Sequence, residues 1–467
     1  MKNQRQRLIA AAVLAFVAAA AAVLVVYNRR MATDVASQLY IPHPAKMTPE
    51  IALLQEYIRI DTSNPPGNES AGARWLSDQL SRGGLPAETI ESAPRRANVY
   101  ARIRGKTPGQ GLILLSHIDV VPAENRSAWS KPPFAASIAA NMLFGRGAAD
   151  MKGITICHLR AFLDIAKSGR MPEHDIVFLA VADEESGGQY GTRWLIRNRP
   201  DVFQGSRYVL GEGGITEVQK ETPTYFGIEI GAKEITDLQL TAPTREQLQR
   251  VRIALEPTFH PRDALRVLPG VRDFFRSVAP LRVQFESLLG DIDGTIASGK
   301  LWLLPPPYRD LVQNTAWAGS IREESGHFSM RVMMSNLPEE DPDARIQWLA
   351  ALVRPMGASI GVITRKEGPI PISSDTTPLF ALLTREVRGV YGNVAVGPEV
   401  LGASTSDSRF LRPLGLDCYG FQPFPIDFFQ TLSIHGVNER VRLDWFASGV
   451  ELTRRVVSAY AFGTKAG

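Results

Sequence analysis

The chain contains very few cysteines, only Cys157 and Cys418 among 467 residues. Two cysteines cannot form the disulfide framework of a small secreted domain. The 39 glycines and 32 prolines are spread along the chain, which excludes a collagen-like or low-complexity protein. At this length, a composition of 44% hydrophobic and 21% charged residues indicates a globular protein of two or three domains.

The body of the chain also lacks an excess of positive charge. The formal net charge is +4, but the first 30 residues hold five basic residues and no acidic one. Subtracting those five from the 52 basic residues leaves 47, against 48 acidic ones. No stripe of lysine and arginine with interleaved aromatic residues occurs. We therefore exclude a nucleic-acid-binding protein.

Charged residues are absent from Leu8–Tyr27, a run of 20 residues that as a helix would span the roughly 30 Å hydrocarbon core of a membrane. It is longer than the typical apolar region of a signal peptide, about 7–15 residues, and Arg29 and Arg30 follow where small cleavage-site residues would be expected. Residues 1–30 are therefore predicted to be an uncleaved signal anchor with a transmembrane helix, with a cleaved signal peptide as the alternative. Residues 31–47 are predicted to be a linker.

The basic residues that flank this segment predict its orientation. Lys2, Arg5 and Arg7 precede it, whereas only the Arg29–Arg30 pair follows. The positive-inside rule then places the body of the protein on the exported side of the membrane. In a Gram-negative bacterium this is the periplasm.

Apolar segments alternate with helical patterns from Thr48 onward. All-apolar runs at residues 112–115 and 176–182 alternate with helical patterns at 154–166 and 191–198. Fully apolar strands separated by helices are typical of an α/β fold. We therefore predict a mixed, mostly parallel sheet with helices on both faces.

The pattern changes between about residues 231 and 365, where alternating and amphipathic segments suggest an inserted α+β lid domain. The α/β pattern returns afterwards, with helices predicted at 378–391 and 444–460. The catalytic domain is thus expected to form from two parts, residues 48–230 and 366–467.

Acidic residues and histidines follow the apolar strands directly. His117 and Asp119 come after the first strand, Glu184 and Glu185 after the second, and Glu212 after a third that ends near Leu210. Because ligands bind beyond the carboxyl ends of strands in an open α/β sheet, these side chains are expected to converge.

Asp150 and His435 complete this group of candidate residues. Two imidazoles with several carboxylates and no thiolate suit Zn²⁺, Co²⁺ or Mn²⁺. More carboxylates are present than one ion needs, which suggests two ions and a further acid that is left to act as a base.

The residues around the candidate site match the motifs of a known family. The matching strings, in chain order, are LLSHIDVVPA (114–123), WSKPPF (129–134), FGRGAADMKG (144–153), ADEESGG (182–188), GEGG (211–214), TSDSRFL (405–411) and SIHGVNER (433–440). In these motifs the chain resembles the co-catalytic zinc metallopeptidases, which include aminoacylase, carboxypeptidase S, acetylornithine deacetylase and succinyl-diaminopimelate desuccinylase. It looks most like the carboxypeptidase S branch, and the resemblance implies a zinc-peptidase-like α/β fold.

The resemblance also implies the metal ligands. His117 and Glu212 would bind one ion, Glu185 and His435 the other, and Asp150 would bridge the two. The expected ions are two Zn²⁺, with Co²⁺ or Mn²⁺ as alternatives. The peptide bond between Asp150 and Met151 is expected to be cis.

Two further acids receive catalytic roles from the same resemblance. Asp119 would orient His117 through the ring nitrogen that does not bind metal. Glu184 would be the general base, which takes a proton from a metal-bridging water and later delivers it to the leaving amine. Since successive strand residues point to opposite sides, Glu184 and Glu185 are expected to act differently.

The lid departs from the family pattern. The family's oxyanion-stabilising histidine is expected soon after the first lid strand, but residues 238–253 contain none. The only histidines of the predicted lid are His260 and His327, each interpreted as a surface or loop residue. At the position of the family's substrate-carboxylate arginine stands Ser335, and Arg331, four residues upstream, is the candidate substitute.

Three functional hypotheses follow. The first is a metal-dependent amidohydrolase or peptidase that cleaves the amide bond of N-acyl amino acids or small peptides. The second is a metal-binding pseudoenzyme that serves as an envelope interaction module, and the third is a hydrolase of esters or activated acyl groups. Retention of Glu184, which metal binding alone does not need, favours an active enzyme. The body is expected to be a monomer or a homodimer.

Overall fold

The computed structural model describes residues 46–255, 265–324, 326–364, 370–402 and 406–463. Within these residues, no helix combines the length and apolar character needed to cross a membrane. The predicted signal anchor lies outside the described part of the chain, as does most of the predicted linker.

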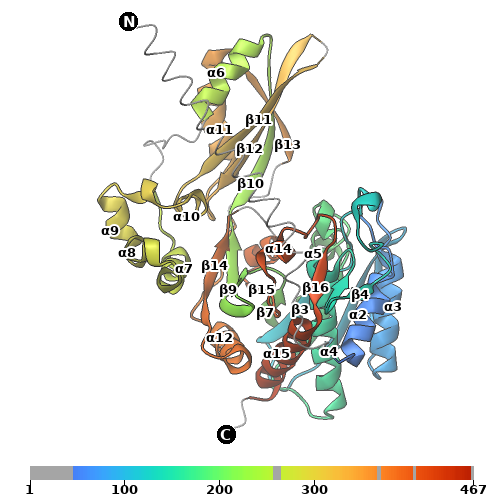
Figure 1. Cartoon of the computed structure of the whole chain (residues 1–467). Helices are drawn as coiled ribbons and strands as arrows, with labels where there is room; N and C mark the ends of the chain where they lie inside the picture. The colour runs from blue at the N-terminus through green and yellow to red at the C-terminus, as the bar shows by residue number, and fades with distance from the viewer. Residues whose placement is uncertain (1–45, 256–264, 325, 365–369, 403–405, 464–467) are drawn as a thin grey trace, which may run out of the picture.

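A large mixed sheet forms the centre of the lower domain in Figure 1. Its strands, in spatial order, are β1 (Glu88–Ala93), β2 (Arg96–Ile103), β6 (Ile176–Val181), β3 (Gly111–His117), β7 (Ser206–Gly211), β15 (Asp417–Phe421), β9 (Thr222–Ala232) and β14 (Ala395–Leu401), and β8 (Thr216–Gln219) pairs with β9. The four central strands β6, β3, β7 and β15 run parallel. The predicted α/β fold with a mixed, mostly parallel sheet is confirmed.

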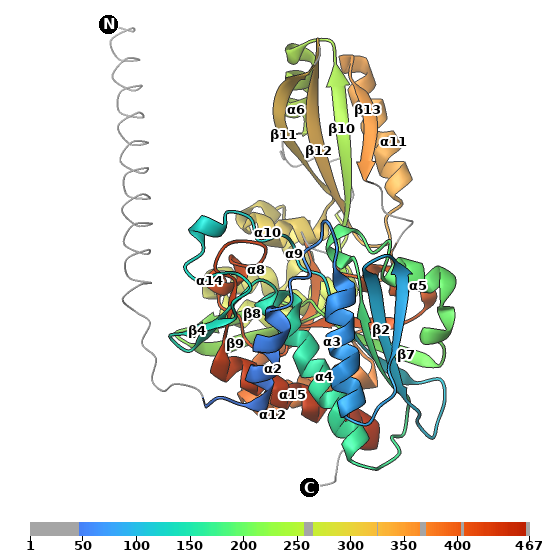
Figure 2. The ribbon, with the colours of Figure 1, turned by 90° about the vertical axis from the view of Figure 1, so that its right-hand side faces the viewer.

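Helices cover both faces of this sheet, because its central strands are apolar on both sides. Leu112 and Leu114 of β3 pack into one hydrophobic cluster, whereas Ile113 and Leu115 pack into the other. The first cluster includes residues of α2 (Pro49–Ile58), α3 (Glu69–Arg82), α4 (Gly153–Lys167), α12 (Pro378–Tyr391) and α15 (Leu443–Phe462). The second includes residues of α5 (Thr192–Asn198) and α13 (Ser408–Leu411). Figure 2 shows α2, α3 and α4 side by side on the first face.

The first helix of the described chain begins at a capping residue. Thr48 caps α2, since its hydroxyl oxygen accepts a hydrogen bond from the Ile51 backbone N–H at 3.3 Å, and Pro49 occupies the first helical position.

A second, smaller domain stands above the first. Its antiparallel sheet has the order β11 (Thr315–Glu324), β12 (His327–Asn336), β10 (Glu234–Ala242) and β13 (Ser359–Thr364). The apolar residues of α6 (Arg245–Leu255) and α11 (Pro342–Val353) pack on one face of this sheet.

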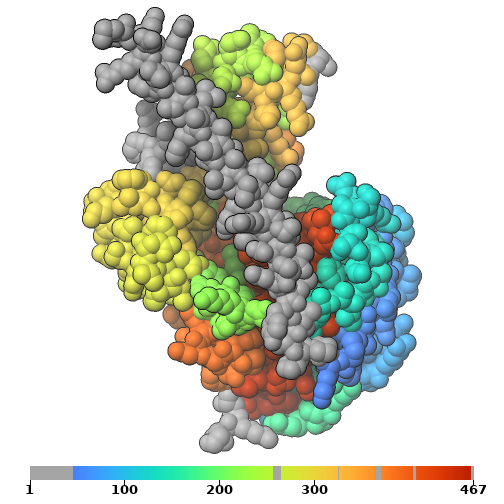
Figure 3. Space-filling view, viewed as in Figure 1, coloured from blue at the N-terminus to red at the C-terminus, as the bar shows by residue number. Residues whose placement is uncertain are grey.

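The middle of the predicted lid does not belong to this smaller domain. Residues 269–312 contain α7 (Pro269–Val278), α8 (Glu286–Gly290), α9 (Ile292–Ala297) and α10 (Pro306–Arg309). Val271 and Phe275 of α7 are buried in the core of the large domain, where α7 packs against β14. The yellow surface in Figure 3 shows this segment against the large domain. Part of the segment predicted as one continuous lid, 231–365, thus packs on the large domain, because helical periodicity does not reveal which domain a helix packs on.

Candidate metal centre

The carboxyl ends of three neighbouring parallel strands bring the candidate residues together. His117 is the last residue of β3, Glu212 follows β7 directly, and Glu184 begins a short 3-10 turn (Glu184–Ser186) after β6. Asp150 lies in the segment Ala148–Lys152 that leads into α4, and its peptide bond with Met151 is cis. His435 belongs to the second part of the large domain and lies in the turns after α14 (Phe428–Thr431).

Asp150 lies at the centre of the cluster. Its two carboxylate oxygens face different histidines, with Oδ1 at 3.0 Å from His117 Nε2 and Oδ2 at 3.0 Å from His435 Nε2. Glu212 Oε2 lies 3.4 Å from His117 Nε2, and Glu185 Oε2 lies 3.2 Å from His435 Nε2. The side chains thus form two groups that share Asp150, in the grouping that the sequence resemblance implied.

Asp119 organises this centre in a way that the sequence did not predict. The His117 Nδ1–H donates to the backbone carbonyl of Asp119 at 2.8 Å, whereas the Asp119 carboxylate is 3.6 Å from that nitrogen. The carboxylate instead accepts the backbone N–H groups of Glu184 at 3.1 Å and of Glu185 at 3.2 Å, and the side-chain amide of Asn64 at 2.8 Å. Asp119 therefore holds both the ring of His117 and the turn that carries the two glutamates.

The two glutamates are not consecutive residues of a strand. Strand β6 ends at Val181, and Asp183 adopts a left-handed conformation with φ of 69° before the turn begins. The prediction that Glu184 and Glu185 differ because they alternate along a strand was therefore wrong in its reason, although the two side chains do face different partners. Glu185 faces His435, whereas Glu184 lies 3.5 Å from Arg409.

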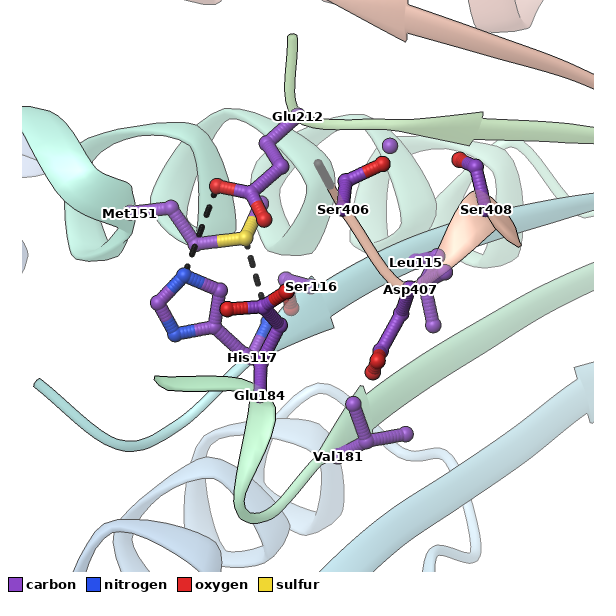
Figure 4. Close-up of a pocket in the computed structure, with 11 residues that line it drawn as sticks. Leu115, Ser116, His117, Met151, Val181, Glu184, Glu212, Ser406, Asp407 and Ser408 are labelled. Atoms are coloured by element: carbon purple, nitrogen blue, oxygen red, sulfur yellow. Dashed lines mark hydrogen bonds and ion pairs between the residues drawn. The ribbon is translucent and has the colours of Figure 1, made fainter. Parts of the chain in front are cut away.

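Glu184 lies on the His117 side of the cluster. Ligand atoms of Glu184, His117 and Glu212 all lie within 4.8 Å of one another. Figure 4 shows the three side chains around a small pocket that Ser406, Asp407 and Ser408 close from the other side. Its volume of about 10 Å³ is room for roughly one water molecule.

Sequence reasoning gave no role to Arg409, although the matched string TSDSRFL contains it. The match to this string could have marked Arg409 as a candidate. Its proximity to Glu184, however, depends on packing between residues 225 positions apart (409 minus 184).

The lid candidates that the structure describes, Arg331 and His327, are not brought to the cluster. Arg331 on β12 forms a two-pronged ion pair with Asp237 on the neighbouring strand β10, at 3.1 and 2.8 Å, and its side chain is 62% exposed. This arrangement gives no support to Arg331 as a substrate-binding residue. His327 is exposed at the start of β12, and His260 lies outside the described residues.

A family model described as Peptidase family M20/M25/M40 matches residues 113–459. The chain belongs to this peptidase family. Aminoacylase-1A of Rattus norvegicus is 26% identical over 425 residues, which cover 90% of this chain and 97% of the relative. Probable carboxypeptidase S-like 2 of Dictyostelium discoideum is 25% identical over 363 residues, 71% of this chain and 68% of the relative.

A solved structure shows the same fold. The M20 family metallo-carboxypeptidase Sso-CP2 from Sulfolobus solfataricus superposes with a TM-score of 0.67 at 18% identity, covering 89% of this chain and 99% of that one. The predicted resemblance is confirmed, and the protein is a metal-dependent hydrolase of the M20 family.

The charges of the cluster fit divalent cations. Burial, together with the charge of Asp150, raises the pKa of Glu212 to about 7. Burial and the charge of Glu212 raise the pKa of Glu184 well above its usual value, against the opposing charge of Arg409. Hydrogen bonds to Asp150 and Glu185 raise the pKa of His435 to about 10. Burial thus disfavours the charged forms of Glu184 and Glu212, and the positive charge of His435 is stabilised by the carboxylates beside it.

The geometry of the donors fits ions as well. Glu185 Oε1 is buried and has no hydrogen-bond partner among the described residues, so a lone pair is left for another ligand. His117 and Glu212 would hold one ion, His435 and Glu185 the other, and Asp150 would be shared.

Zinc is expected to stabilise the fold, because bound cations compensate carboxylates that are otherwise buried together. At free Zn²⁺ about 100-fold above its dissociation constant, binding should add about 2.7 kcal/mol to the free energy of unfolding. Thermal melting with Zn²⁺ and with a chelator measures this effect. His117→Ala should reduce the shift, whereas His174→Ala, outside the cluster, should preserve it. Equal melting curves for the wild-type protein in zinc and in chelator would contradict the metal centre.

Proposed function

We propose that this protein hydrolyses the amide bond of N-acyl amino acids or small peptides, with two divalent ions, most suitably Zn²⁺, in the cluster. The observation that carries this proposal is the presence of Glu184 beside the five candidate ligands. The names of the relatives, an aminoacylase and a carboxypeptidase S-like protein, support this substrate class.

The residues of the chain divide the chemistry between them. Bound divalent ions supply Lewis-acid polarisation of the scissile carbonyl and lower the pKa of the attacking water. Glu184 is placed to accept the proton of that water and to return it to the leaving nitrogen. Arg409 Nη1 lies 3.5 Å from Glu184 Oε1, and this ion pair holds the Glu184 carboxylate in place beside the pocket. The Asp119 carboxylate accepts the backbone N–H of Glu184 and so fixes the turn that carries this residue.

Replacement of Glu184 by Gln is expected to abolish turnover and to leave both ions bound, since the amide has nearly the same size but cannot carry the proton. Glu185→Gln is the matched variant one residue away, and it should lose metal instead. Elemental analysis and hydrolysis of N-acyl amino acids, dipeptides and an activated ester measure the two effects. Normal amide hydrolysis by Glu184→Gln would remove the general-base assignment, and loss of metal would show that Glu184 is a ligand.

Exposed apolar side chains lie on the segment that carries His435. Phe428 and Leu432 are 69% and 62% exposed, and Phe429 and Val437 lie on the same short segment as His435. The segment is not loose, because Asp427 and Gln430 form a reciprocal capping box around α14. We propose that these exposed apolar side chains, on the segment that carries the candidate ligand His435, favour substrates with an apolar group.

Phe428→Ser is therefore expected to lower kcat/KM for an N-hexanoyl amino acid about tenfold and to change that for the N-acetyl compound little, because only the longer acyl chain covers this ring. Met171→Ser is the control, since Met171 is 61% exposed and precedes β6 at the opposite edge of the sheet. Equal losses for both substrates in Phe428→Ser would contradict an apolar subsite.

We also propose that the protein is anchored in a membrane by its first 30 residues, with its body on the exported side. The support for this proposal is the uncharged run Leu8–Tyr27 and its flanking basic residues. The full chain should remain in the membrane pellet after alkaline carbonate extraction, whereas residues 31–467 alone should be released. Protease added to intact spheroplasts should digest the body. Full-length protein in the soluble fraction would contradict the anchor.

A further inference from the structure

Glu439 accepts four hydrogen bonds from the segment that carries Asp150. Its Oε2 accepts from Arg146 Nη1 at 2.6 Å and from the Gly147 backbone N–H at 3.0 Å. Its Oε1 accepts from the backbone N–H groups of Ala149 at 2.9 Å and of Asp150 itself at 3.1 Å. The turn that carries Asp150, the central acid of the cluster, thus wraps around this carboxylate.

Arg146 connects the same carboxylate to the segment that carries His435. Its second terminal nitrogen, Nη2, donates to the backbone carbonyl of Gly436 at 2.9 Å. The ion pair is buried, with the side chains of Arg146 and Glu439 only 2% and 1% exposed. Water therefore cannot substitute for either partner.

The segment that carries His435 requires these stabilising contacts because its backbone is strained. His435 and Asn438 both have φ of 60°, in the left-handed region that residues with a side chain rarely adopt. Between them, Gly436 is held by Arg146, and the Asn438 side chain accepts the Ser130 backbone N–H at 2.7 Å. The chain beyond the insertion is thus attached to residues 130–150 on both sides of Val437.

We propose that Glu439 and Arg146 are positioning residues that set the distance between Asp150 and His435, and so determine the affinity of the second ion. This inference rests on the proposed dinuclear site. Neither residue is placed to touch substrate or ion, because both act through the backbone next to the ligands. Asp150 and His435 lie 285 residues apart in the chain and come from opposite sides of the insertion.

Glu439→Gln is the first test, since the amide nitrogen cannot accept hydrogen bonds and two of the four donors lose their acceptor. Arg146→Lys is the second, because it retains the positive charge but cannot bridge Glu439 and Gly436 together. Both variants are expected to bind the first Zn²⁺ with little change and the second about 10–100-fold more weakly. Competition with a chromophoric chelator measures both affinities, and elemental analysis gives the stoichiometry.

Asp175→Asn is the matched control. Asp175 is also a buried carboxylate that accepts from arginine side chains, Arg102 and Arg104, and from a backbone N–H, but it lies just before β6, at the amino-terminal end of that strand and remote from the cluster. It should leave both affinities unchanged. Circular dichroism and melting of each metal-free variant establish that it is folded, and the lysine variant provides the test if Glu439→Gln does not fold.

The outcomes separate the two proposals. Wild-type protein that binds fewer than two ions would overturn the dinuclear site. Wild-type protein that binds two, together with folded Glu439→Gln or Arg146→Lys that binds both with wild-type affinity, would overturn the positioning role. An equal loss of affinity in Asp175→Asn would also overturn it, because the effect would then follow from general destabilisation.

Discussion

The candidate site is built on carboxylates that share a small, mostly buried space at the carboxyl ends of the parallel strands of a mixed sheet. Removal of these groups from water raises the pKa of Glu184, Glu185 and Glu212, and the two imidazoles and the guanidinium of Arg409 oppose their charge. Such an arrangement is unfavourable by itself and becomes favourable when cations bind. The surrounding structure serves largely to hold these groups in place.

Two different supports meet at the cluster. On the amino-terminal side, Asp119 fixes the His117 ring through its carbonyl and the glutamate turn through its carboxylate. On the carboxyl-terminal side, the pair of Arg146 and Glu439 attaches the His435 segment to the Asp150 segment. The insertion between the two parts of the large domain therefore does not separate the site, since both parts contribute strands to one sheet.

The features that the sequence predicted depend on local chemistry and on strand order. The apolar runs before His117, Glu184 and Glu212 predicted both the parallel sheet and the convergence of these residues at its edge. The features that it missed depend on contacts between distant segments. The packing of α7 on β14, the ion pair that draws Arg331 to Asp237, and the hydrogen bonds of Glu439 all join residues that no local pattern relates. The burial of Val271 and Phe275 in the large domain follows from such a contact.

The central claim is that two ions lie on either side of Asp150, one toward His117 and Glu212 and the other toward His435 and Glu185. Anomalous diffraction from crystals of the zinc-loaded protein, recorded on both sides of the zinc absorption edge, tests it most directly. Two anomalous peaks that both contact the Asp150 carboxylate are expected. A single peak, or peaks that leave Asp150 without a metal contact, would contradict the account.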